Sequence, residues 1–586
     1  MKHRLPRRGR PLSAAWLARH DRGGIGGAYD RLTLLCTDLD LPVHRWHGDV
    51  AGSRKSAVLR SPAGILLITP ESLEALFVTG GTKIGGILGA LRYVVIDEFH
   101  SFIGTERGAQ LQSLLHRIDL LTRYRVPRIA LSATLGDFDA AASFLRPGAG
   151  DAVQRISSDD DSRELRLQLR GYLALDPAKQ RPKITDSLVQ GAPDDPTGKA
   201  DADPWDKAAI ADHLFRTLRG KDNLVFARSR GSVEEYSDML DRRSRASGVP
   251  NEFLPHHGNL SKDLREHVEA RLKDSALPIT AICTSTLEMG IDIGSVHSVA
   301  QIGAPPSVAS LRQRLGRSGR RDGEPAILRL YLSEPEVTAK TPPSDLLRSE
   351  LVQSIAMIDL LLEKWYEPPD LSRLHLSTLI QQILSVIAQR SGARADALYS
   401  ALCASGPFAR VDRQMFVHFL QTMGAADLII QSTDGLLLPG PTGERVINHY
   451  SFYTAFHTAE EYRLVTSGRT IGSLPIDFPV VPGTLLIFGG QRWKALDIHP
   501  EQKVIELIRS AGGRPPHFSG SSGEVADEVR RRMLSIYAST EIPTYLDRTA
   551  QALLLEGRES FERYQLAHRP IVDWGKDVVL FPFCGD

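Results

Sequence analysis

Two adjacent carboxylates, Asp97 and Glu98, follow the apolar run LRYVVI of residues 91–96. Carboxylates at the end of a buried strand are costly to desolvate unless they hold a cation. The pair is therefore predicted to bind a magnesium nucleotide, with Asp97 on the metal, Glu98 orienting the attacking water and His100 beside the nucleotide. The alternative is a solvated Asp-Glu pair at a strand end.

A basic run, QRLGRSGRR, occupies residues 313–321. Arginines at a three-residue spacing lie on one helical face, so Arg314, Arg317 and Arg320 are expected to project together. Arg317 and Arg320 are predicted to contact the γ-phosphate, a contact worth roughly three to five orders of magnitude in rate in other nucleotide hydrolases. Gln313 is predicted to contact the same nucleotide. The alternative is a solvated basic turn that binds nucleic-acid phosphates.

Hydroxyl residues and glycines are interspersed in the segment TSTLEMGIDIG, which begins at Thr284. Thr284 and Thr286 are predicted to hold a nucleic-acid phosphate. Asp292, which follows Gly290 in this segment, is predicted to bind a nucleotide ribose. Ordinary turn chemistry is the alternative for each of these residues.

Two other motifs, SAT and TPES, place small hydroxyl residues at the ends of expected strands. Ser132 and Thr134 are predicted to hydrogen-bond the carboxylate site and to couple it to nucleic acid. Thr69, Pro70 and Glu71 begin a helix whose amino terminus can bind a nucleic-acid phosphate. Turn formation and helix capping are the alternatives.

Aromatic and imidazole side chains gather in two loops, HRWHGDV (44–50) and LPHHGNLS (254–261). The loops take corresponding places in two halves of the chain, which favours contact with a bound strand through stacking or phosphate binding. His257 and Arg228 are both predicted to contact nucleic acid. Metal binding by the histidine pairs is the alternative, but no acidic or cysteine partner has the spacing to complete such a site.

Short β-branched runs alternate with helical stretches in both halves. Each run ends in polar residues, as buried parallel strands do when reactive side chains lie at their carboxyl ends. The pattern predicts an α/β fold with two parallel-sheet domains whose motifs face one cleft that closes on a ligand. The expected strands are 64–70, 91–100, 128–134, 223–229, 279–286 and 296–303.

The composition sets broad limits. A formal net charge of +1 excludes a global basic field, so any nucleic-acid surface must be local. Four widely spaced cysteines form no CxxC pair, which argues against disulfides and zinc and favours a reducing, cytoplasmic location. No apolar run is long enough to cross a membrane, so no membrane partner is expected.

With these motifs the chain resembles superfamily 2 helicases of the DEAD/DEAH-box type, specifically the large helicase-related (Lhr) family. The resemblance covers residues 28–586, and the strings GERVINHYSFYTAF, GGQRWKALDI and GGRPPHFSG point to Lhr. It implies ATP and magnesium as cofactors, and single-stranded or duplex DNA or an RNA–DNA hybrid as partner. It also implies 3′-to-5′ movement, strand separation coupled to ATP hydrolysis, and a repair-related role.

The resemblance implies two RecA-like domains, the first incomplete, followed by a winged-helix domain and a β-rich carboxyl-terminal domain. Helical stretches followed by two strands around an Asp434-Gly435 turn favour the winged helix. The predicted divisions are an atypical basic segment (1–27), a partial RecA-like domain (28–170), a linker (171–206), a second RecA-like domain (207–345), a winged-helix-like domain (346–440) and an Lhr-type β-rich region (441–586).

The sequence departs from the family pattern at the phosphate-binding loop. A GxxxxGK[ST] motif is expected before the motifs above, but RGGIGGAYD (22–30) has glycines and no lysine. Without that segment the first sheet is expected to lose its central strand and to expose an apolar core. The chain is therefore interpreted as a truncated or frameshifted helicase that a separate upstream polypeptide could complement.

The first 23 residues carry seven lysines and arginines against one acidic residue, with no apolar core of a signal peptide. An aberrant start is the preferred interpretation, and a basic disordered arm or an organellar transit peptide is the alternative. The leading functional hypothesis is an ATP-dependent helicase. The alternatives are a catalytically inactive nucleic-acid-binding remnant and a translocase that remodels protein–DNA complexes without unwinding.

Overall fold

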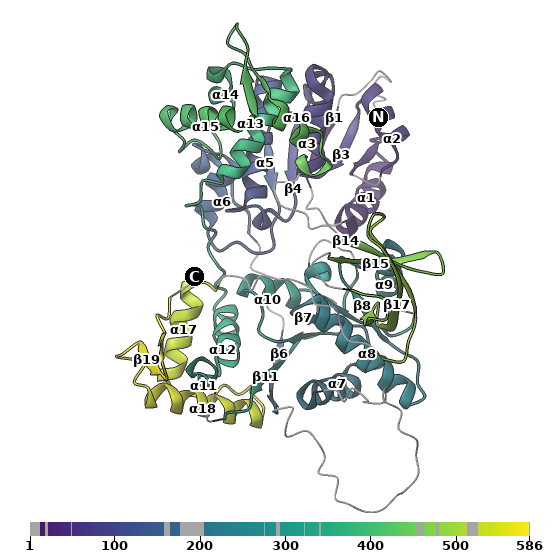
Figure 1. Ribbon diagram of the computed structural model, residues 1–586, viewed down its shortest axis with the longest axis vertical. Helices are drawn as coiled ribbons and strands as arrows, with labels where there is room; N and C mark the ends of the chain where they lie inside the picture. Colours follow the sequence, from purple (N-terminus) through teal and green to yellow (C-terminus); the bar gives the residue numbers. More distant parts are fainter. Residues whose placement is uncertain are drawn as a thin grey trace, which may run out of the picture. The chain divides into compact units, whose positions relative to one another are not determined.

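The computed structural model divides by its contacts into two units (Figure 1). Unit 1 comprises residues 1–159, 290–292 and 368–458, and unit 2 comprises residues 160–289, 293–367 and 459–586. Residues 12–17 and 22–27 are described by their backbone alone. The described residues are 12–17, 22–47, 50–157, 164–175, 204–274, 276–288, 293–320, 323–338, 341–453, 461–475, 480–512 and 525–584.

Unit 1 contains a five-stranded sheet in which every adjacent pair of strands is parallel. Parallel strands bring their carboxyl ends to one edge, so the loops that follow them meet there. In spatial order the strands are β2 (Val43–Trp46), β3 (Gly64–Ile68), β1 (Leu12–Leu17), β4 (Tyr93–Ile96) and β5 (Arg128–Ala130). The accompanying helices are α1 (Arg22–Thr37), α2 (Gly52–Arg60), α3 (Pro70–Gly80), α4 (Ile84–Leu88), α5 (Glu106–Thr122) and α6 (Phe138–Leu145), with short 3₁₀ helices η1 (Gly81–Lys83), η2 (Phe99–Ser101) and η3 (Gly150–Ala152).

Residues 12–17 fill the central position of this sheet. Strand β1 pairs with β3 through Ala14↔Ile65 and with β4 through Ala14↔Tyr93. The expectations that residues 1–27 form only a basic segment and that the first sheet loses its central strand are therefore wrong. The run LSAAWL satisfies backbone groups of both flanking strands, and the glycine-rich segment after it opens helix α1.

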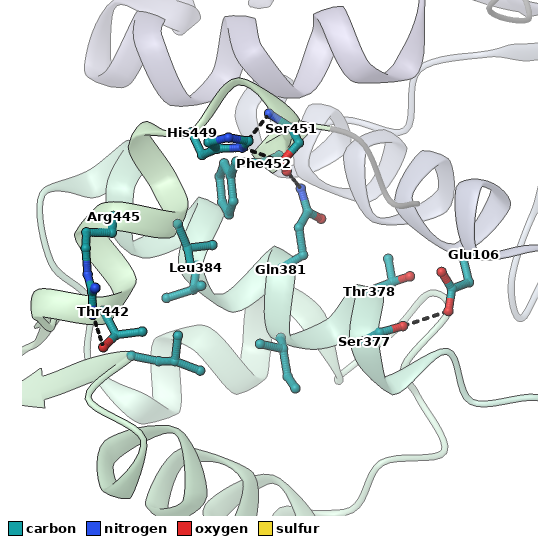
Figure 2. Close-up of a pocket in the computed structure, with 13 residues that line it drawn as sticks. Glu106, Ser377, Thr378, Gln381, Leu384, Thr442, Arg445, His449, Ser451 and Phe452 are labelled. Atoms are coloured by element: carbon teal, nitrogen blue, oxygen red, sulfur yellow. Dashed lines mark hydrogen bonds between the residues drawn. The ribbon is translucent and has the colours of Figure 1, made fainter. Parts of the chain in front are cut away.

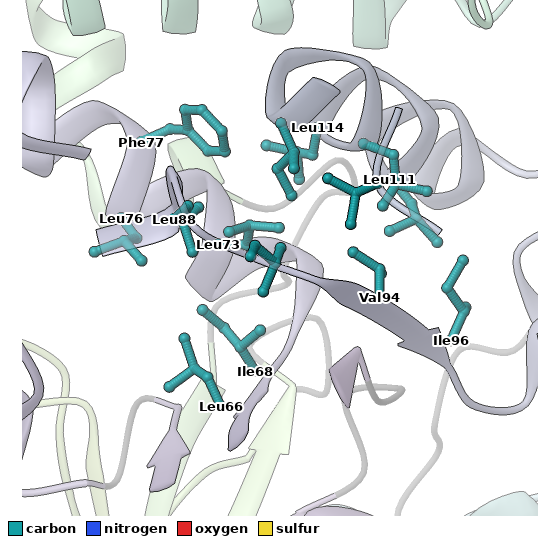
Figure 3. Close-up of a cluster of buried hydrophobic side chains, with 14 of the residues drawn as sticks. Leu66, Ile68, Leu73, Leu76, Phe77, Leu88, Val94, Ile96, Leu111 and Leu114 are labelled. Atoms are coloured by element: carbon teal, nitrogen blue, oxygen red, sulfur yellow. The ribbon is translucent and has the colours of Figure 1, made fainter. Parts of the chain in front are cut away.

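The core of unit 1 lies between the sheet and its helices (Figure 3). Strand β3 has the apolar sequence GILLI, as expected of a parallel strand covered on both faces. Helix α3 contributes Leu73, Leu76 and Phe77, whose three- and four-residue spacing puts them on one face. The expected exposure of an apolar core is not found at the centre of the sheet, where Leu66, Ile68, Val94 and Ile96 are buried.

A helical subdomain completes unit 1. Its elements are α13 (Leu376–Arg390), α14 (Ala395–Leu402), α15 (Arg413–Ala425), the antiparallel pair β12 (Ile429–Gln431) and β13 (Leu437–Pro439), α16 (Pro441–Asn448) and η5 (Tyr450–Tyr453). The hairpin turns at Gly435, whose φ of 83° suits glycine. This is the element order predicted for a winged helix, and the winged-helix assignment stays a prediction.

Buried polar side chains join this subdomain to helices α3 and α5. Arg117 donates from Nη1 to Glu74 Oε1 at 2.8 Å and from Nη2 to Gln389 Oε1 at 2.6 Å. Gln382 accepts from Ser113 Oγ at 2.7 Å and donates to Glu74. Burial lowers the pKa of Arg117, and the Glu74 carboxylate opposes that shift. The subdomain is therefore held by directional polar contacts as well as by apolar packing.

Unit 2 contains a six-stranded sheet, again with every adjacent pair parallel. In spatial order its strands are β6 (Leu165–Ala174), β11 (Ala326–Pro335), β10 (Ser298–Ile302), β7 (Asn223–Ala227), β9 (Thr280–Cys283) and β8 (Phe253–His256). Its helices are α7 (Trp205–Leu218), α8 (Arg230–Ala246), α9 (Lys262–Asp274), α10 (Val308–Leu315), α11 (Pro343–Leu346) and α12 (Ser349–Leu362), with the 3₁₀ helix η4 (Ser285–Leu287). Two parallel-sheet domains were predicted, and both are confirmed.

The structure differs from the predicted domain divisions at two places. The first domain was predicted to end at residue 170 and the linker to begin at 171. Residues 165–174 instead form one strand, β6, which pairs with β11 of the second sheet along its whole length and so belongs to unit 2. The linker's residues 176–203 lie outside the described part of the chain. The predicted 346–440 domain is divided, because α12 packs in unit 2 while α13 to α15 belong to unit 1.

The carboxyl-terminal part of unit 2 begins with a second five-stranded sheet. In spatial order its strands are β15 (Arg469–Pro475), β14 (Glu461–Thr466), β18 (Val504–Arg509), β17 (Gln491–His499) and β16 (Leu485–Phe488). The predicted β-rich region is confirmed here. The remainder is mainly helical, and its helices pack against α12. It consists of α17 (Asp527–Ala538), α18 (Arg548–Arg563) and the hairpin β19 (Ile571–Trp574) and β20 (Asp577–Leu580).

Among the described residues, no helix combines the length and apolar character that crossing a membrane requires.

Candidate functional site

Asp97 and Glu98 lie at the carboxyl edge of the first sheet, directly after β4. Glu98 has a φ of 50°, a left-handed conformation that costs a non-glycine residue about 1 kcal/mol or more. Its backbone N–H donates to Asp97 Oδ1 at 3.0 Å, which fixes the first carboxylate beside the turn. Ser101 Oγ donates to the Glu98 carbonyl at 2.7 Å. Both carboxylates are half-buried, as expected of a cation site open to a ligand.

The carboxylates fit magnesium only together with ligands from outside the protein. Magnesium prefers octahedral oxygen coordination and is usually held by one or two carboxylates with waters and substrate phosphates. Within the described ranges, no group of three or more His, Cys, Asp or Glu residues is placed to hold a metal. A nucleotide phosphate beside Asp97 would supply the missing oxygens.

The SAT motif lies against the carboxylate loop. His100 Nδ1 and Ser132 Oγ are 2.9 Å apart, and Ser132 Oγ donates to the Thr134 carbonyl at 2.9 Å. The backbone N–H of Phe99 donates to the Leu131 carbonyl, also at 2.9 Å. His100 Nδ1 lies 3.8 Å from the carboxylate of Glu98. The predicted link between the two motifs therefore has a direct route through His100.

The side chains of the TPES motif make contacts within the protein. Thr69 caps α3 by accepting from the Ser72 N–H at 3.2 Å, and Pro70 occupies the first turn. Glu71 accepts from Arg107 Nε at 2.6 Å and Nη2 at 3.2 Å. The side chains of Thr69 and Glu71 are buried and have internal capping and ion-pair roles, and the nucleic-acid contact predicted for this helix start stays a prediction.

The arginine run does not form one projecting face. Helix α10 ends at Leu315, and the turn at Gly319, with a φ of 66°, breaks the helical spacing. Arg314 is buried, and its Nε and Nη2 donate to Glu288 Oε2 at 3.0 and 2.8 Å. Arg317 donates from Nε and Nη2 to the Glu288 carbonyl at 3.1 and 2.9 Å.

Arg320 behaves differently from its two neighbours. It is exposed, and its Nε donates to the Gly316 carbonyl at 2.8 Å. Gln313 is half-buried on α10. The expectation that Arg314, Arg317 and Arg320 project together is wrong, because α10 ends at Leu315 and the three side chains do not share one helical face. Arg320 presents the most accessible guanidinium of the three.

Glu288 is a site residue that the sequence analysis missed. It binds Arg314 through its carboxylate and Arg317 through its carbonyl, and so connects the arginine run to the segment after β9. The acidic residue between two threonines and two glycines was the available signal. Gly290 and Asp292, which were predicted to contact the nucleotide, lie outside the described residues.

The two threonines of the same segment differ in their contacts. Thr286 Oγ1 lies 2.8 Å from His256 Nδ1 and donates to the His256 carbonyl at 3.2 Å. Thr284 occupies the position before η4, makes no side-chain capping hydrogen bond there and is half-buried. The phosphate contacts predicted for them stay predictions, and for Thr286 the hydroxyl is already engaged internally.

His257 has a structural role. It is fully buried, and its Nε2 lies 2.7 Å from Glu234 Oε1. Glu234 also accepts from the N–H groups of Gly489 and Gly490 at 2.7 Å each, so this pair holds the β16–β17 turn against α8. The nucleic-acid contact predicted for His257 stays a prediction, and the described contacts of this side chain are internal. Arg228, 57% exposed, forms an ion pair with Glu350.

Unit 1 also holds a cavity of about 800 Å³ between α13, α16 and η5 (Figure 2). Gln381 Nε2 donates to the Phe452 carbonyl at 3.1 Å, and His449 Nδ1 lies 2.6 Å from Ser451 Oγ. Arg445, beside them, donates to Thr442 Oγ1 at 3.1 Å. A guanidinium and an imidazole above apolar side chains suit a ligand with both a phosphate and a base. The sequence analysis did not predict this cavity.

Family comparisons match the two parallel-sheet domains. The model described as "DEAD/DEAH box helicase" matches residues 28–141, and the one described as "Helicase conserved C-terminal domain" matches residues 206–322. The first range contains Asp97, Glu98 and Ser132, and the second contains the arginine run. These sequence motifs thus lie within the residue ranges that match the two family models.

Similar curated proteins carry the same family name. The "Lhr helicase/uracil glycosylase" of Escherichia coli is 28% identical over 56% of this chain and 24% of that protein. The "Lhr helicase/ probable uracil glycosylase" of Mycolicibacterium smegmatis is 26% identical over 81% of this chain and 32% of that protein. The "ATP-dependent helicase Lhr-Core" of Methanothermobacter thermautotrophicus is 32% identical over 47% and 29% respectively. The matches span about a quarter to a third of these relatives.

Solved structures share the fold. The structure of "Mycobacterium smegmatis helicase Lhr bound to ssDNA and AMP-PNP" has a TM-score of 0.65 and 22% identity, covering 95% of this chain and 66% of that one. The "DUF1998 helicase MrfA bound to DNA and AMPPNP" has a TM-score of 0.62 and 16% identity, covering 86% and 64%. Residues 28–141 and 206–322 thus match helicase family models, and the chain is similar in sequence and in fold to Lhr helicases.

Proposed function

We propose that this chain is the motor part of an ATP-dependent helicase that acts on nucleic acid. The observation that carries the proposal is the carboxylate pair Asp97–Glu98 at the sheet edge, connected through His100 to Ser132. Relatives named as ATP-dependent helicases and a similar structure bound to ssDNA and AMP-PNP support it. Because the chain spans only part of the length of these relatives, ATP hydrolysis by this chain is itself part of what we propose.

The residue roles follow from their positions. Asp97 holds a magnesium ion, which when bound offsets the phosphate charge of ATP. Glu98 orients the attacking water. Arg320 contacts the γ-phosphate with its exposed guanidinium, and Arg317 joins it once its bond to the Glu288 carbonyl is exchanged for the phosphate. Gln313, Gly290 and Asp292 are proposed as further nucleotide contacts.

A hydrolysis assay tests this proposal. The purified chain is expected to release phosphate from ATP with magnesium, and faster when single-stranded DNA is added. Glu98→Gln should lower that rate by about a hundredfold or more, because it removes the residue that orients the water. Glu501→Gln, a matched change at an exposed position, should leave the rate unchanged. A rate unaffected by Glu98→Gln contradicts the assigned role.

The nucleic-acid partner is proposed to be single-stranded or duplex DNA, with RNA–DNA hybrids as further substrates. The cavity lined by Arg445 and His449 offers a phosphate and base contact in unit 1. Arg445→Ala should weaken binding of a fluorescent oligonucleotide and reduce the salt dependence of its affinity. Arg390→Ala, on helix α13, is the control for a general loss of positive charge.

A second candidate function is an inactive nucleic-acid-binding protein. It is favoured by one observation, that no GxxxxGK[ST] motif occurs in the 586 residues. DNA binding without phosphate release would support it. Recovery of hydrolysis on adding a polypeptide that carries such a loop would support complementation by a separate chain. Hydrolysis without strand displacement would indicate a translocase.

The chain is proposed to act in the cytoplasm. Its four cysteines, Cys36, Cys283, Cys403 and Cys584, are all free thiols. Burial raises the pKa of Cys403 to about 12, which keeps that thiol protonated and unreactive. Free thiols suit a reducing compartment. Localisation of a tagged chain by cell fractionation tests this assignment.

A further inference from the structure

A second cavity of unit 1, about 370 Å³ in volume, is lined by four arginines and one aspartate. The arginines are contributed by the carboxyl end of α5, the segment leading into β5, and the turn after α6. Because β4 ends at Ile96, just before Asp97, and α5 runs back to the beginning of β5, this cavity lies at the amino ends of the strands. It is therefore on the opposite edge of the sheet from the carboxylate site. Its charged residues are Asp119, Arg123, Arg125, Arg128 and Arg146.

The single carboxylate is already engaged. Asp119 Oδ2 accepts from Arg128 Nη2 at 2.6 Å and lies 3.5 Å from Arg146 Nη1. Its Oδ1 accepts from the Val126 N–H at 2.9 Å. One aspartate against four arginines leaves a formal excess of three positive charges. His116, which also lines the cavity, adds no charge at neutral pH because burial lowers its pKa.

The inner wall is built from partly desolvated guanidinium groups. The side chain of Arg128 is 5% accessible and that of Arg146 is 18% accessible. Burial lowers the pKa of Arg128 to about 10, Asp119 opposes the shift, and Arg146 and Arg125 add to it. The Arg128 guanidinium therefore stays charged at neutral pH. A bound anion would offset its repulsion from the guanidinium groups of Arg146 and Arg125.

The mouth of the cavity carries two further arginines. Arg123 and Arg125 are exposed, and neither makes a hydrogen bond or ion pair to another of the residues that the structure describes. Arg123 ends α5 in a left-handed conformation with a φ of 60°. Guanidinium groups offer planar, forked donors that match phosphate oxygens. The donors of both residues are therefore available to a ligand.

We propose that this cavity binds a phosphate group that carries two or more negative charges. Its volume is within the range of small-ligand sites. The phosphate can come from a free diphosphate-type anion or from the backbone of a nucleic acid. The site is separate from Asp97 and Glu98, and the proposal does not depend on ATP hydrolysis by this chain.

Calorimetric titration with inorganic pyrophosphate, in the absence of ATP and magnesium, tests the proposal on the whole chain. The wild type should bind pyrophosphate saturably. The double variant Arg123→Ala/Arg125→Ala should bind pyrophosphate at least about tenfold more weakly, because each substitution removes charged hydrogen-bond donors. Arg31→Ala, an exposed arginine on α1, should bind within about twofold of wild type. Matching thermal unfolding curves for the three proteins show that the fold is retained.

A second titration identifies the source of the phosphate. If the double variant also loses affinity for a fluorescent oligonucleotide and pyrophosphate competes with that oligonucleotide, the ligand is a nucleic-acid backbone. If oligonucleotide binding is unchanged while pyrophosphate binding is lost, the ligand is a free anion. Unsaturable pyrophosphate binding, or equal affinity in the double variant and the wild type, overturns the proposal.

Discussion

His100 and Ser132 join the two motif loops of the first sheet through a contact of 2.9 Å between Nδ1 and Oγ. The two residues follow neighbouring parallel strands and are 32 positions apart in the chain. His100 Nδ1 also lies 3.8 Å from the carboxylate of Glu98, while the Ser132 hydroxyl donates a hydrogen bond to the Thr134 carbonyl. The imidazole of His100 lies beside Glu98, the carboxylate that is proposed to orient water. A displacement of the Ser132 loop would therefore change the position of this imidazole.

Replacing Ser132 tests this coupling. Ser132→Ala removes the partner of His100, a loss of about 1 kcal/mol or roughly fivefold in an equilibrium or rate. We expect the stimulation of ATP hydrolysis by single-stranded DNA to fall by that factor, with a smaller change in hydrolysis without DNA. Steady-state phosphate release with and without oligonucleotide measures both. Ser53→Ala, on the exposed face of α2, is the control, and an equal effect in the two variants contradicts the coupling.

Glu288 should stabilise unit 2 through its buried pair with Arg314. Glu288→Gln keeps the side-chain shape but leaves a guanidinium that is 5% accessible without its carboxylate, at a cost of about 3 kcal/mol. Denaturant unfolding of the purified variant measures the loss. Glu266→Gln removes a carboxylate that is 60% exposed beside Lys262, and should change the free energy of unfolding by less than about 0.5 kcal/mol. Equal losses in both variants would refute the anchoring role.

The fold was predictable where local sequence pattern decides structure. The expected strands at 64–70, 91–100 and 128–134 contain β3, β4 and β5, because continuous apolar runs ending in polar residues are typical of parallel strands. The same pattern placed Asp97 and Glu98 at the sheet edge. Strand β1 was missed because a short apolar run after a strongly basic segment has no distinguishing period.

Sequence motifs could not reveal the internal contacts that side chains make with residues distant in the chain. His257 has the composition of a ligand-binding loop, yet Glu234, 23 residues earlier on α8, accepts its bond in the core. Arginines at a three-residue spacing face together only while a helix continues, and α10 ends at Leu315. Neither Glu234 nor the helix end is visible from the motif itself.

The buried pair of Glu74 and Arg117 should be essential to the contact between α5 and the helical subdomain. Their side chains are 0% and 3% accessible, so Arg117→Met leaves an unpaired carboxylate and should cost about 3 to 5 kcal/mol. Glu74→Leu/Arg117→Met removes both charges and should recover part of that loss. Chemical unfolding of the two variants measures the difference. A double variant that is less stable than Arg117→Met would contradict this account.

Glu334 should make the stability of unit 2 depend on pH. It is 4% accessible on β11, and burial raises its pKa to about 7, although the Leu351 N–H that donates to it at 2.9 Å opposes the shift. The unfolded glutamate has a pKa of 4.5, so between about pH 4.5 and 7 the folded protein binds more protons than the unfolded chain. The contribution of Glu334 to the free energy of unfolding therefore falls as pH rises through this window, by on the order of 3 kcal/mol, and is constant above it.

Replacing the acid with its neutral isostere isolates this contribution. Glu334→Gln cannot ionise and still accepts from the Leu351 N–H, so it should be more stable than wild type at pH 8 and similar to it at pH 5. Urea unfolding at the two pH values gives the difference directly, and Glu501→Gln, at an exposed position, should follow the wild type at both. If Glu334→Gln and wild type lose stability in parallel between pH 5 and 8, the pH dependence comes from other groups and Glu334 is not protonated in the folded protein.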